Sequence, residues 1–355
     1  MIRDETIFLT GFPGFIATRL LRRLSTEANH FLLLVQPALV EQAKREIQEI
    51  ADRAGEPVKK FQILEGDITR PDLSLSARDR ETACSETTVI FHLAALYDLA
   101  VTRGTALTVN VDGTRHINEF ARQVRALHHY HYVSTCYVAG KREGRIFETE
   151  LQHAAGFRNF YEETKYLAEM EVEALKAKLP TTIHRPAVVC GDSKTGATAK
   201  YDGVYYLIRY LLRWPRLLCL FNIGNQDVSL NLVPVDFLVE AMLQLAGDER
   251  AIGKTLQLAD PNPLTTQELF DTIACCLTGR KSFVTIPAPW VQFSLMLPPS
   301  PAITGLPHHG VPYFFVRQTY DTREADELLG SHNLKCPPFR SYAKVIVEYA
   351  ARHGH

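Results

Sequence analysis

A glycine-rich turn near the start of the chain constrains the fold more than any other feature. The pattern G-x-x-G-x-x-A runs from Gly11 to Ala17, directly after an apolar stretch at 6–10 and before an amphipathic stretch at 15–24. Gly11 permits a sharp turn, Gly14 lets backbone approach a pyrophosphate, and Ala17 allows close helix-to-strand contact. This context predicts the first unit of a dinucleotide-binding sheet. The alternative is an ordinary strand-to-helix turn.

Apolar and amphipathic stretches continue to alternate through the first 190 residues. Strands are expected at 6–10, 31–35, 60–64, 89–93, 130–134 and 182–185, and helices at 15–24, 40–53, 109–125 and 161–179. This alternation is typical of a doubly wound, mostly parallel α/β sheet of the Rossmann type.

The composition and periodicity of the sequence change after Gly191, where proline and glycine become more frequent and the periodic stretches become shorter. Helices are expected at 205–213, 236–245, 266–278 and 342–352, and a strand at 229–233. We therefore predict an NAD(P)-binding Rossmann domain at 1–190 and a smaller mixed α/β substrate-binding region at 191–355, packed on it. A substrate cleft is expected where the two regions meet.

Composition narrows the partner and the compartment. The 355 residues carry 39 basic and 40 acidic side chains, a net charge of −1, so the basic excess of a nucleic-acid binder is missing and a small-molecule partner is expected. The seven cysteines show no C-x-x-C spacing, which is typical of free thiols in a reducing compartment. No signal peptide and no membrane span are expected, so a cytoplasmic location follows. The apolar run around Trp290 suits either a lipid-binding wall or ordinary core.

The most informative short pattern is Tyr161-x-x-x-Lys165. A spacing of four places the phenol and the ammonium on one face of a helix, where the cation would lower the phenol pKa and favour proton exchange. On its own this spacing is common on solvated helices. Here Ser134 and Thr135 stand at the end of the expected fifth strand, where a hydroxyl would reach the same substrate oxygen.

At this point the sequence resembles the extended short-chain dehydrogenase/reductases over almost its whole length. Within them it is most similar to the fatty acyl-CoA reductase and thioester reductase branch. The residues that carry the resemblance are Gly11 to Ala17, Gly66-Asp67, His92 to Ala95, Asn110 to Thr114, Val133 to Thr135, Tyr161-x-x-x-Lys165 and Arg185 to Gly196.

The resemblance implies roles for particular residues. Tyr161 would be the general acid, Lys165 would hold the nicotinamide ribose and tune Tyr161, and Thr135, or else Ser134, would bind the carbonyl oxygen. Asn110 would support the region of Lys165. The expected cofactor-binding residues are Thr10, Gly11, Pro13, Gly14, Phe15, Ile16, Gln36, Asp67, Ile68, Leu93, Ala94, Ala95, Tyr161, Lys165, Pro186 and Val188.

The expected cofactor is NADPH, with NAD as the alternative. The second strand ends at Gln36 without a carboxylate that would repel a 2′-phosphate, which permits NADP. The branch usually has an arginine just after this strand, and its absence weakens the NADP assignment.

Substrate contacts are expected from Ser134 and Cys136 and from the cations Arg209 and Arg213, which lie one helical turn apart and would suit the phosphates of coenzyme A or a carrier phosphopantetheine. The alternatives are a buried filler for Cys136 and a solvated helix face for the arginines. The histidine pairs at 128–131 and 308–309 lack regularly spaced co-ligands, so no metal is expected.

The leading functional hypothesis is an NADPH-dependent reductase of a fatty acyl thioester or of the derived long-chain aldehyde. A nucleotide-sugar epimerase or dehydratase, or a hydroxysteroid-type dehydrogenase, would use the same three residues with a different second region. A non-enzymatic dinucleotide sensor is disfavoured by Thr135, Tyr161 and Lys165 being present together. A homodimer through the helices at 109–125 and 161–179 is a further expectation taken from the family.

Overall fold

The computed structural model describes residues 3–27, 29–304, 306, 308 and 310–354. Its centre is a seven-stranded, entirely parallel sheet within these residues, with strand order β11-β7-β5-β4-β1-β2-β3. The strands are β1 (Thr6–Thr10), β2 (His30–Val35), β3 (Phe61–Glu65), β4 (Val89–His92), β5 (His129–Val133), β7 (Thr181–Pro186) and β11 (Thr255–Leu258). The expected doubly wound α/β sheet is confirmed.

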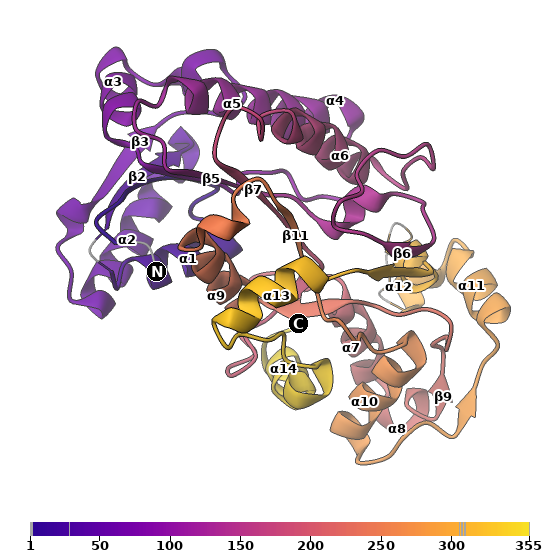
Figure 1. The fold of residues 1–355 in the computed structure, drawn as a ribbon. Coiled ribbons are helices and arrows are strands. Elements are labelled where there is room, and N and C mark those ends of the chain that lie inside the picture. Colours follow the sequence, from indigo (N-terminus) through magenta and orange to yellow (C-terminus); the bar gives the residue numbers. More distant parts are fainter. Residues whose placement is uncertain (1–2, 28, 305, 307, 309, 355) are drawn as a thin grey trace.

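Two helical layers cover the sheet (Figure 1). One contains α1 (Phe15–Leu24), α2 (Val40–Ala54) and α9 (Val235–Ala246), and the other contains α3 (Ala77–Glu86), α5 (Gly113–Gln123) and α6 (Phe160–Glu173). In β1, Ile7 and Leu9 pack with the α1 layer, whereas Phe8 packs with the α5 layer. Because successive side chains of a strand point to opposite faces, a fully apolar strand buries both of them.

Two helix boundaries differ from the sequence expectation. The helix expected at 161–179 ends at Glu173, and the segment that follows forms turns up to Leu179, where Pro180 disfavours helical geometry at the residue before it. The helix expected at 109–125 is a composite of α4 (Arg103–Ala106), a π-helical segment (Leu107–Asp112) and α5. Helical structure therefore starts earlier and carries a wide turn at Asn110.

The second region returns to the sheet. Its strand β11 pairs with β7, and its helix α9 packs on α1, so both regions build one sheet. The strand expected at 229–233 is shorter, as β10 (Leu232–Pro234), with Ser229 in an isolated bridge to Thr265. The helix expected at 266–278 is α10 (Thr266–Thr278), fixed by a capping box between Thr265 and Glu268.

A separate core lies within the second region. It joins α7 (Val204–Arg213), α10 and α14 (Phe339–His353) through buried apolar side chains. The other helices and strands of this region are α8 (Pro215–Leu218), β9 (Phe221–Asn222), β12 (Val284–Thr285), α11 (Ala288–Met296), α12 (Ser300–Thr304), β13 (Gln318–Tyr320) and α13 (Arg323–Ser331). Strand β8 (Val188–Cys190), at the end of the first region, pairs with β10. Strand β13 pairs with β6 (Gly144–Ile146) of the first region.

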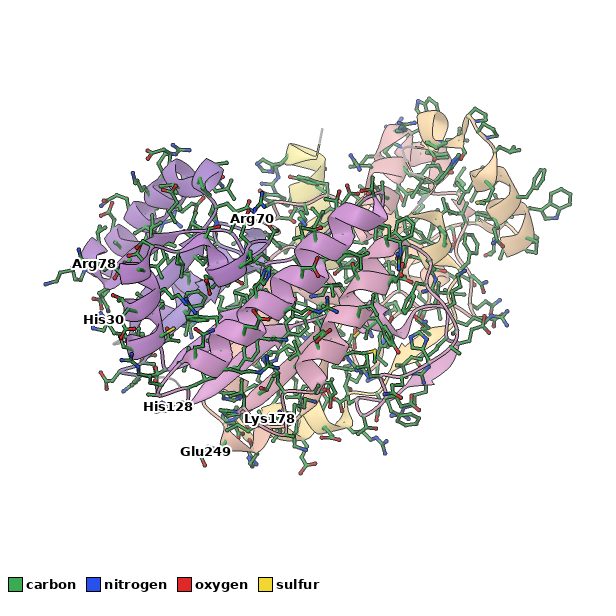
Figure 2. The ribbon with its side chains drawn as sticks, turned by 90° about the horizontal axis from the view of Figure 1, so that it is seen from above. His30, Arg70, Arg78, His128, Lys178 and Glu249 are labelled. Atoms are coloured by element: carbon green, nitrogen blue, oxygen red, sulfur yellow. The ribbon has the colours of Figure 1, made fainter. Side chains whose placement is uncertain are left out.

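The sheet has two distinct edges. In Figure 2 the labelled His30, His128, Lys178 and Glu249 follow one margin of the molecule, and they begin or precede β2, β5, β7 and β11. The opposite edge collects the carboxyl ends of the strands, where ligands of open α/β sheets bind.

Membrane-spanning helices and metal clusters are both missing from the described residues. None of their helices combines the length and apolar character needed to cross a membrane. They also contain no group of three or more His, Cys, Asp or Glu side chains arranged to hold a metal ion.

Candidate active site

A cavity of about 590 Å³ opens at the carboxyl edge of the sheet. Residues that follow β1, β2, β4, β5 and β7 line it together with α6 and the start of the second region. Fifteen of the sixteen expected cofactor-binding residues line this cavity, namely Thr10, Gly11, Pro13, Gly14, Phe15, Ile16, Gln36, Ile68, Leu93, Ala94, Ala95, Tyr161, Lys165, Pro186 and Val188. Asp67 does not line it, and its carboxylate instead accepts a hydrogen bond from the backbone N–H of Thr69 (2.8 Å).

The glycine turn forms one wall of the cavity and fits an anionic cofactor. Gly11 has φ +89°, and a Cβ there would stand 2.9 Å from the backbone nitrogen of Ala94. A Cβ on Gly14 would meet the Gly11 carbonyl oxygen at 2.6 Å. Helix α1 begins directly after Gly14 with no side-chain cap and no acidic residue in its first turn. Its N–H groups therefore face the cavity as the phosphates of a dinucleotide require.

Buried polar groups hold this wall from behind. Thr10 Oγ1 lies 2.8 Å from His92 Nδ1 and accepts from the backbone N–H of Ala94 at 3.1 Å. His92 Nε2 lies 3.2 Å from the Thr114 hydroxyl, which donates to the carbonyl of Asn110. Burial lowers the pKa of His92 to about 3, so its ring is neutral and acts only as a spacer between β1, β4 and α5.

Tyr161 and Thr135 meet at the floor of the cavity. Tyr161 lies on the first turn of α6 and Thr135 directly follows Ser134 at the end of β5. Burial raises the pKa of the Tyr161 phenol, and a side-chain hydrogen bond with Thr135 partly offsets this. The phenol is therefore held protonated, in the form that can donate a proton to an oxygen bound beside Thr135.

Lys165 lies one turn further along α6 and also lines the cavity. Its Nζ donates to the Tyr132 hydroxyl and to the carbonyl of Val133, both at 2.8 Å. Burial lowers the pKa of Lys165 to about 7, while Glu169 opposes this shift. The expectation that Lys165 lowers the pKa of Tyr161 is not met in this structure, because burial dominates the phenol and the ammonium is directed at Tyr132 and Val133.

Glu169 organises the buried side of the site. Its carboxylate accepts from the guanidinium of Arg185 at 2.5 and 2.8 Å and from the hydroxyl of Ser134. The charges of Glu169 and Arg185 are both almost fully buried and compensate each other. Ser134 also lines the cavity, but its hydroxyl is engaged with Glu169, which leaves Thr135 as the hydroxyl available to a substrate oxygen.

Asn110 lies beside the region of Lys165, because its side chain bonds to Thr164, the residue before Lys165. Its amide accepts from the backbone N–H of Leu96 (2.8 Å) and donates to the Leu96 carbonyl (3.3 Å) and the Thr164 hydroxyl (3.0 Å). It does not line the cavity. Asn110 therefore ties the loop after β4 to α6 and positions both walls of the site.

The expected substrate residues of the second region lie elsewhere. Neither Arg209 nor Arg213 lines the cavity. Arg209 donates to the carbonyl of Tyr201 (3.2 Å) and lies over the ring of Tyr206, whereas Arg213 is exposed at the end of α7. Cys136 is buried, donates to the carbonyl of Arg185, and has its thiol pKa raised by burial, so it is an unreactive filler.

Sequence reasoning missed a polar cluster at the cavity. The ring of Tyr97 meets the ring of Tyr161 edge-on at 4.9 Å, and Lys200 Nζ lies 4.4 Å from the Tyr97 ring centre. A side-chain hydrogen bond joins Tyr97 to Asp202. Tyr97 and the other two residues come from loops more than 90 positions apart, so no local pattern relates them.

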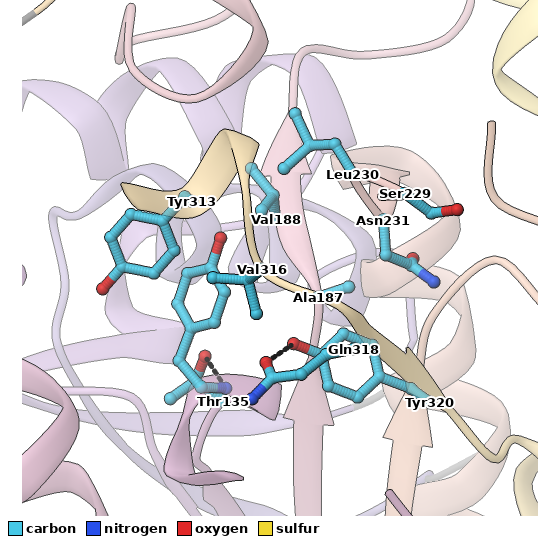
Figure 3. Close-up of a pocket in the computed structure, with 11 residues that line it drawn as sticks. Thr135, Ala187, Val188, Ser229, Leu230, Asn231, Tyr313, Val316, Gln318 and Tyr320 are labelled. Atoms are coloured by element: carbon cyan, nitrogen blue, oxygen red, sulfur yellow. Dashed lines mark hydrogen bonds between the residues drawn. The ribbon is translucent and has the colours of Figure 1, made fainter. Parts of the chain in front are cut away.

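A small second cavity lies behind Thr135 (Figure 3). It shares Thr135, Tyr137, Ala187 and Val188 with the main cavity and has room for about one water molecule, with a volume of about 20 Å³. Figure 3 shows Gln318 pointing across it toward Thr135, and the Gln318 amide accepts from the Tyr320 hydroxyl at 3.2 Å. The second region thus closes the site beside Thr135.

The chain is similar to known proteins over more than two thirds of its length. The sequence profile of the family described as "Male sterility protein" matches residues 9–242. The chain is 26% identical over 285 residues to the fatty acyl-CoA reductase wat of Drosophila melanogaster, covering 69% of this chain and 54% of that protein. It is 27% identical over 285 residues to a linear gramicidin synthase polypeptide of Brevibacillus parabrevis, covering 76% and 5%. The chain thus spans about half the length of the first of these relatives, and a small part of the second.

Solved structures share the fold. The terminal R domain of the myxalamid PKS-NRPS pathway superposes with a TM-score of 0.82 at 24% identity, covering 100% of this chain and 92% of that one. UDP-glucuronic acid 4-epimerase from Bacillus cereus in complex with NAD superposes with a TM-score of 0.67 at 18% identity, covering 97% and 96%. At these identities the two structures establish the architecture alone.

Proposed function

Because the chain belongs to the Male sterility protein family, we propose that it is an NADPH-dependent reductase of an acyl thioester, or of the long-chain aldehyde derived from one. The observation that carries this proposal is the cavity in which Thr135, Tyr161 and Lys165 face the glycine turn. The relative from Drosophila melanogaster is a fatty acyl-CoA reductase, which agrees with a thioester substrate.

The residues of the chain divide the reaction as follows. The bound dinucleotide would supply the hydride that reaches the carbonyl carbon. Thr135 holds the carbonyl oxygen through its hydroxyl, and Tyr161 donates its phenolic proton to that oxygen when an aldehyde is reduced to an alcohol. Lys165, with a pKa near neutrality, lies within the same cavity to orient the ribose of the cofactor. Glu169 and Arg185 keep the strand ends in place.

The relatives of the chain favour reduction over the main alternatives. The same three residues would serve an epimerase or an alcohol dehydrogenase, so they do not separate these functions. We rank the nucleotide-sugar epimerase and the hydroxysteroid-type dehydrogenase below the reductase, because the family profile covers residues 9–242 and the relative from Drosophila melanogaster is a fatty acyl-CoA reductase.

The substrate test uses the chain as it exists. Purified protein is incubated with NADPH and acyl-CoA thioesters of increasing chain length, and separately with the matching aldehydes. Cofactor oxidation is followed at the nicotinamide absorbance, and products are identified by mass. Reduction of a thioester or a long aldehyde is expected. Turnover of a nucleotide sugar with no net use of NADPH would instead establish the epimerase.

Cofactor choice has its own test at Gln36. This side chain lines the cavity just beyond β2, where a carboxylate would bind the ribose 2′-hydroxyl of NAD and repel a 2′-phosphate. The wild-type protein is expected to prefer NADPH, and Gln36→Asp should shift the ratio of kcat/KM toward NADH by about tenfold, the effect of roughly 1.4 kcal/mol. Gln36→Glu serves as a second acidic variant. An unchanged ratio in both would remove Gln36 from cofactor selection.

A further inference from the structure

The exposed apolar side chains of this protein are concentrated at one margin of the second region. Among the described residues, ten of the fifteen large hydrophobic side chains with substantial exposure fall in two short segments, 214–221 and 283–297. We call these two segments the apolar margin. Single exposed hydrophobic residues are ordinary, but a concentration of this kind marks an interaction surface.

The two segments of the apolar margin are neighbours in space. Strand β12 pairs with β9, with Val284 opposite Phe221, and the N–H of Phe283 donates to the carbonyl of Leu220 at 2.9 Å. Helix α11 begins three residues after β12. In Figure 1, β9 and α11 lie along the right-hand side of the molecule, away from α1, α2 and α3.

Helix α11 is apolar on both of its faces. Val291 and Leu295, four residues apart, are buried against Phe314 and Phe315. On the other face Trp290 is 70% exposed and Phe293 is 66% exposed. The sequence left open whether this run is a lipid-binding wall or lid, or ordinary core. Its outer face is not core, because Trp290 and Phe293 are exposed, and neither side chain lines the main cavity.

The exposed charges carried by the two segments of the apolar margin and their immediate sequence neighbours are positive. The sequence contains no Asp or Glu between Arg280 and Tyr320 or between Gly203 and Gln226. Arg216, Arg280 and Lys281 are exposed, and none of them joins an ion pair within the described part of the chain. Asp271 contacts these segments but accepts hydrogen bonds from Asn222 and Ser282. The partner of this surface should therefore be both apolar and anionic.

We propose that the apolar margin docks the protein on an anionic lipid surface. Tryptophan and phenylalanine side chains beside cations suit the boundary between headgroups and acyl chains, and cations near anionic headgroups strengthen the attachment. The buried face of α11 packs on Tyr206 of α7, and Asp202, four residues earlier, lines the main cavity. Docking at this margin would therefore bring the part of the main cavity that contains Asp202 toward the lipid surface. The proposal does not depend on the reaction proposed above.

The protein carries its own reporter for the test. Its only two tryptophans, Trp214 and Trp290, both belong to the apolar margin and are 62% and 70% exposed. Vesicles made of equal parts phosphatidylcholine and phosphatidylglycerol are expected to shift the tryptophan emission to the blue, and lipids with brominated acyl chains are expected to quench it. The protein should bind vesicles of phosphatidylcholine alone at least about tenfold more weakly, because these vesicles have no anionic headgroups to attract its cations.

Matched variants separate this surface from general effects. In co-sedimentation with the mixed vesicles, Trp290→Ser with Phe293→Ser should weaken binding about tenfold, whereas Val58→Ser with Ile252→Ser, exposed apolar residues elsewhere, should not. Arg280→Glu with Lys281→Glu should weaken binding by about tenfold or more, whereas Lys59→Glu with Arg78→Glu makes the same change in net charge and should leave it within about twofold. All the substituted side chains are exposed, so folding is preserved.

Three outcomes would overturn the proposal. The first is no emission shift or sedimentation with the mixed vesicles. The second is binding that both pairs of variants, margin and control, weaken equally. The third is a blue shift that depends on protein concentration without vesicles, or that an acidic acyl carrier protein produces when vesicles do not, because the surface would then bind a second copy or a protein partner.

Discussion

Strands β5 and β7 bury titratable side chains on both of their faces. Burying a charge is costly, and the two faces avoid this cost in different ways. Toward α6, the cation of Arg185 meets the carboxylate of Glu169, and Lys165 donates to Tyr132. Toward α9, the side chains are His129, His131 and His184, with His131 Nδ1 and His184 Nε2 3.1 Å apart. One face holds compensated charges, and the other holds neutral rings.

The two faces differ in their surroundings: one is packed in the core, and the other borders the cavity. Burial lowers the pKa of His129 to about 4 and of His184 to about 3, and it holds that of His131 well below its usual range. Neutral imidazoles serve as core side chains there, although His131 Nε2 and His184 Nδ1 have no hydrogen-bond partner in the described residues. The α6 face borders the cavity, and its charges fix the strand ends that carry Ser134 and Thr135. Only that face should matter to chemistry.

Tyr161→Phe should produce the largest effect. Removing the phenolic proton donor is expected to lower kcat for aldehyde reduction by about 10²–10⁴-fold, because general acid catalysis contributes that much. Binding of NADPH, measured by its fluorescence, should change less than about threefold. Tyr97→Phe is the matched control, since this half-buried ring touches Tyr161 in the same cavity. Equal losses in both variants would contradict the assignment of the proton to Tyr161.

Glu169→Gln should be the most destabilising change on the charged face. It leaves the buried Arg185 without its counter-charge, which costs about 3–5 kcal/mol of unfolding free energy. Urea unfolding measures this change. Glu173→Gln is the control, because the ion pair of Glu173 with Lys176 is partly exposed and contributes about 1 kcal/mol or less. If both variants unfold alike, the compensated pair does not distinguish the two faces.

The histidine face should make the protein sensitive to acid. Below the ordinary histidine pKa of 6.5 the unfolded chain takes up protons that the folded chain refuses, since the folded pKa values are depressed. The contribution of these neutral histidines to the free energy of unfolding is therefore fully present above that pH. It falls as the pH drops toward 4, by up to about 1.4 kcal/mol per pH unit for each histidine. Unfolding free energies at a series of pH values measure the slope.

Histidine substitutions test whether the buried imidazole rings cause this pH dependence of the free energy of unfolding. His131→Leu should reduce the acid slope by about one quarter, because it removes one of four buried histidines with depressed pKa values, the fourth being His92 on another part of the sheet. The exposed His30→Leu should leave it unchanged. Equal unfolding free energies of the wild-type protein at about pH 7 and pH 5 would contradict the proposed difference between the two faces.

Ser134→Ala should have the smallest effect. The Ser134 hydroxyl donates to Glu169, so its loss costs about 1–2 kcal/mol of stability and leaves kcat nearly unchanged. Thr135→Ala, one residue further on, should lower kcat by about tenfold or more, because its hydroxyl is the one that faces Tyr161. A reversed order of activity loss would exchange the roles of the two neighbours.

The parts of the site that were predictable are those encoded within a few residues. The turn from Gly11 to Ala17 and the Tyr161-x-x-x-Lys165 spacing are each read within a single element, and fifteen expected cofactor residues line the cavity. Arg209 and Arg213 do not line this cavity, and their role as substrate contacts stays a prediction. Helix periodicity shows that two side chains share a face but not which way that face points.

Short patterns in the sequence are sufficient to predict the class of sheet, the position of the glycine turn, and the placing of Tyr161 and Lys165 one helical turn apart. These depend on short-range geometry, in which strand and helix periods and glycine conformation decide the outcome. Three other features depend on how the layers pack: Lys165 donates to Tyr132 and Val133, Tyr97 and Asp202 meet beside Tyr161, and Trp290 lies outside the core. Such contacts join segments far apart in the chain, and their partners exist only after the layers have packed.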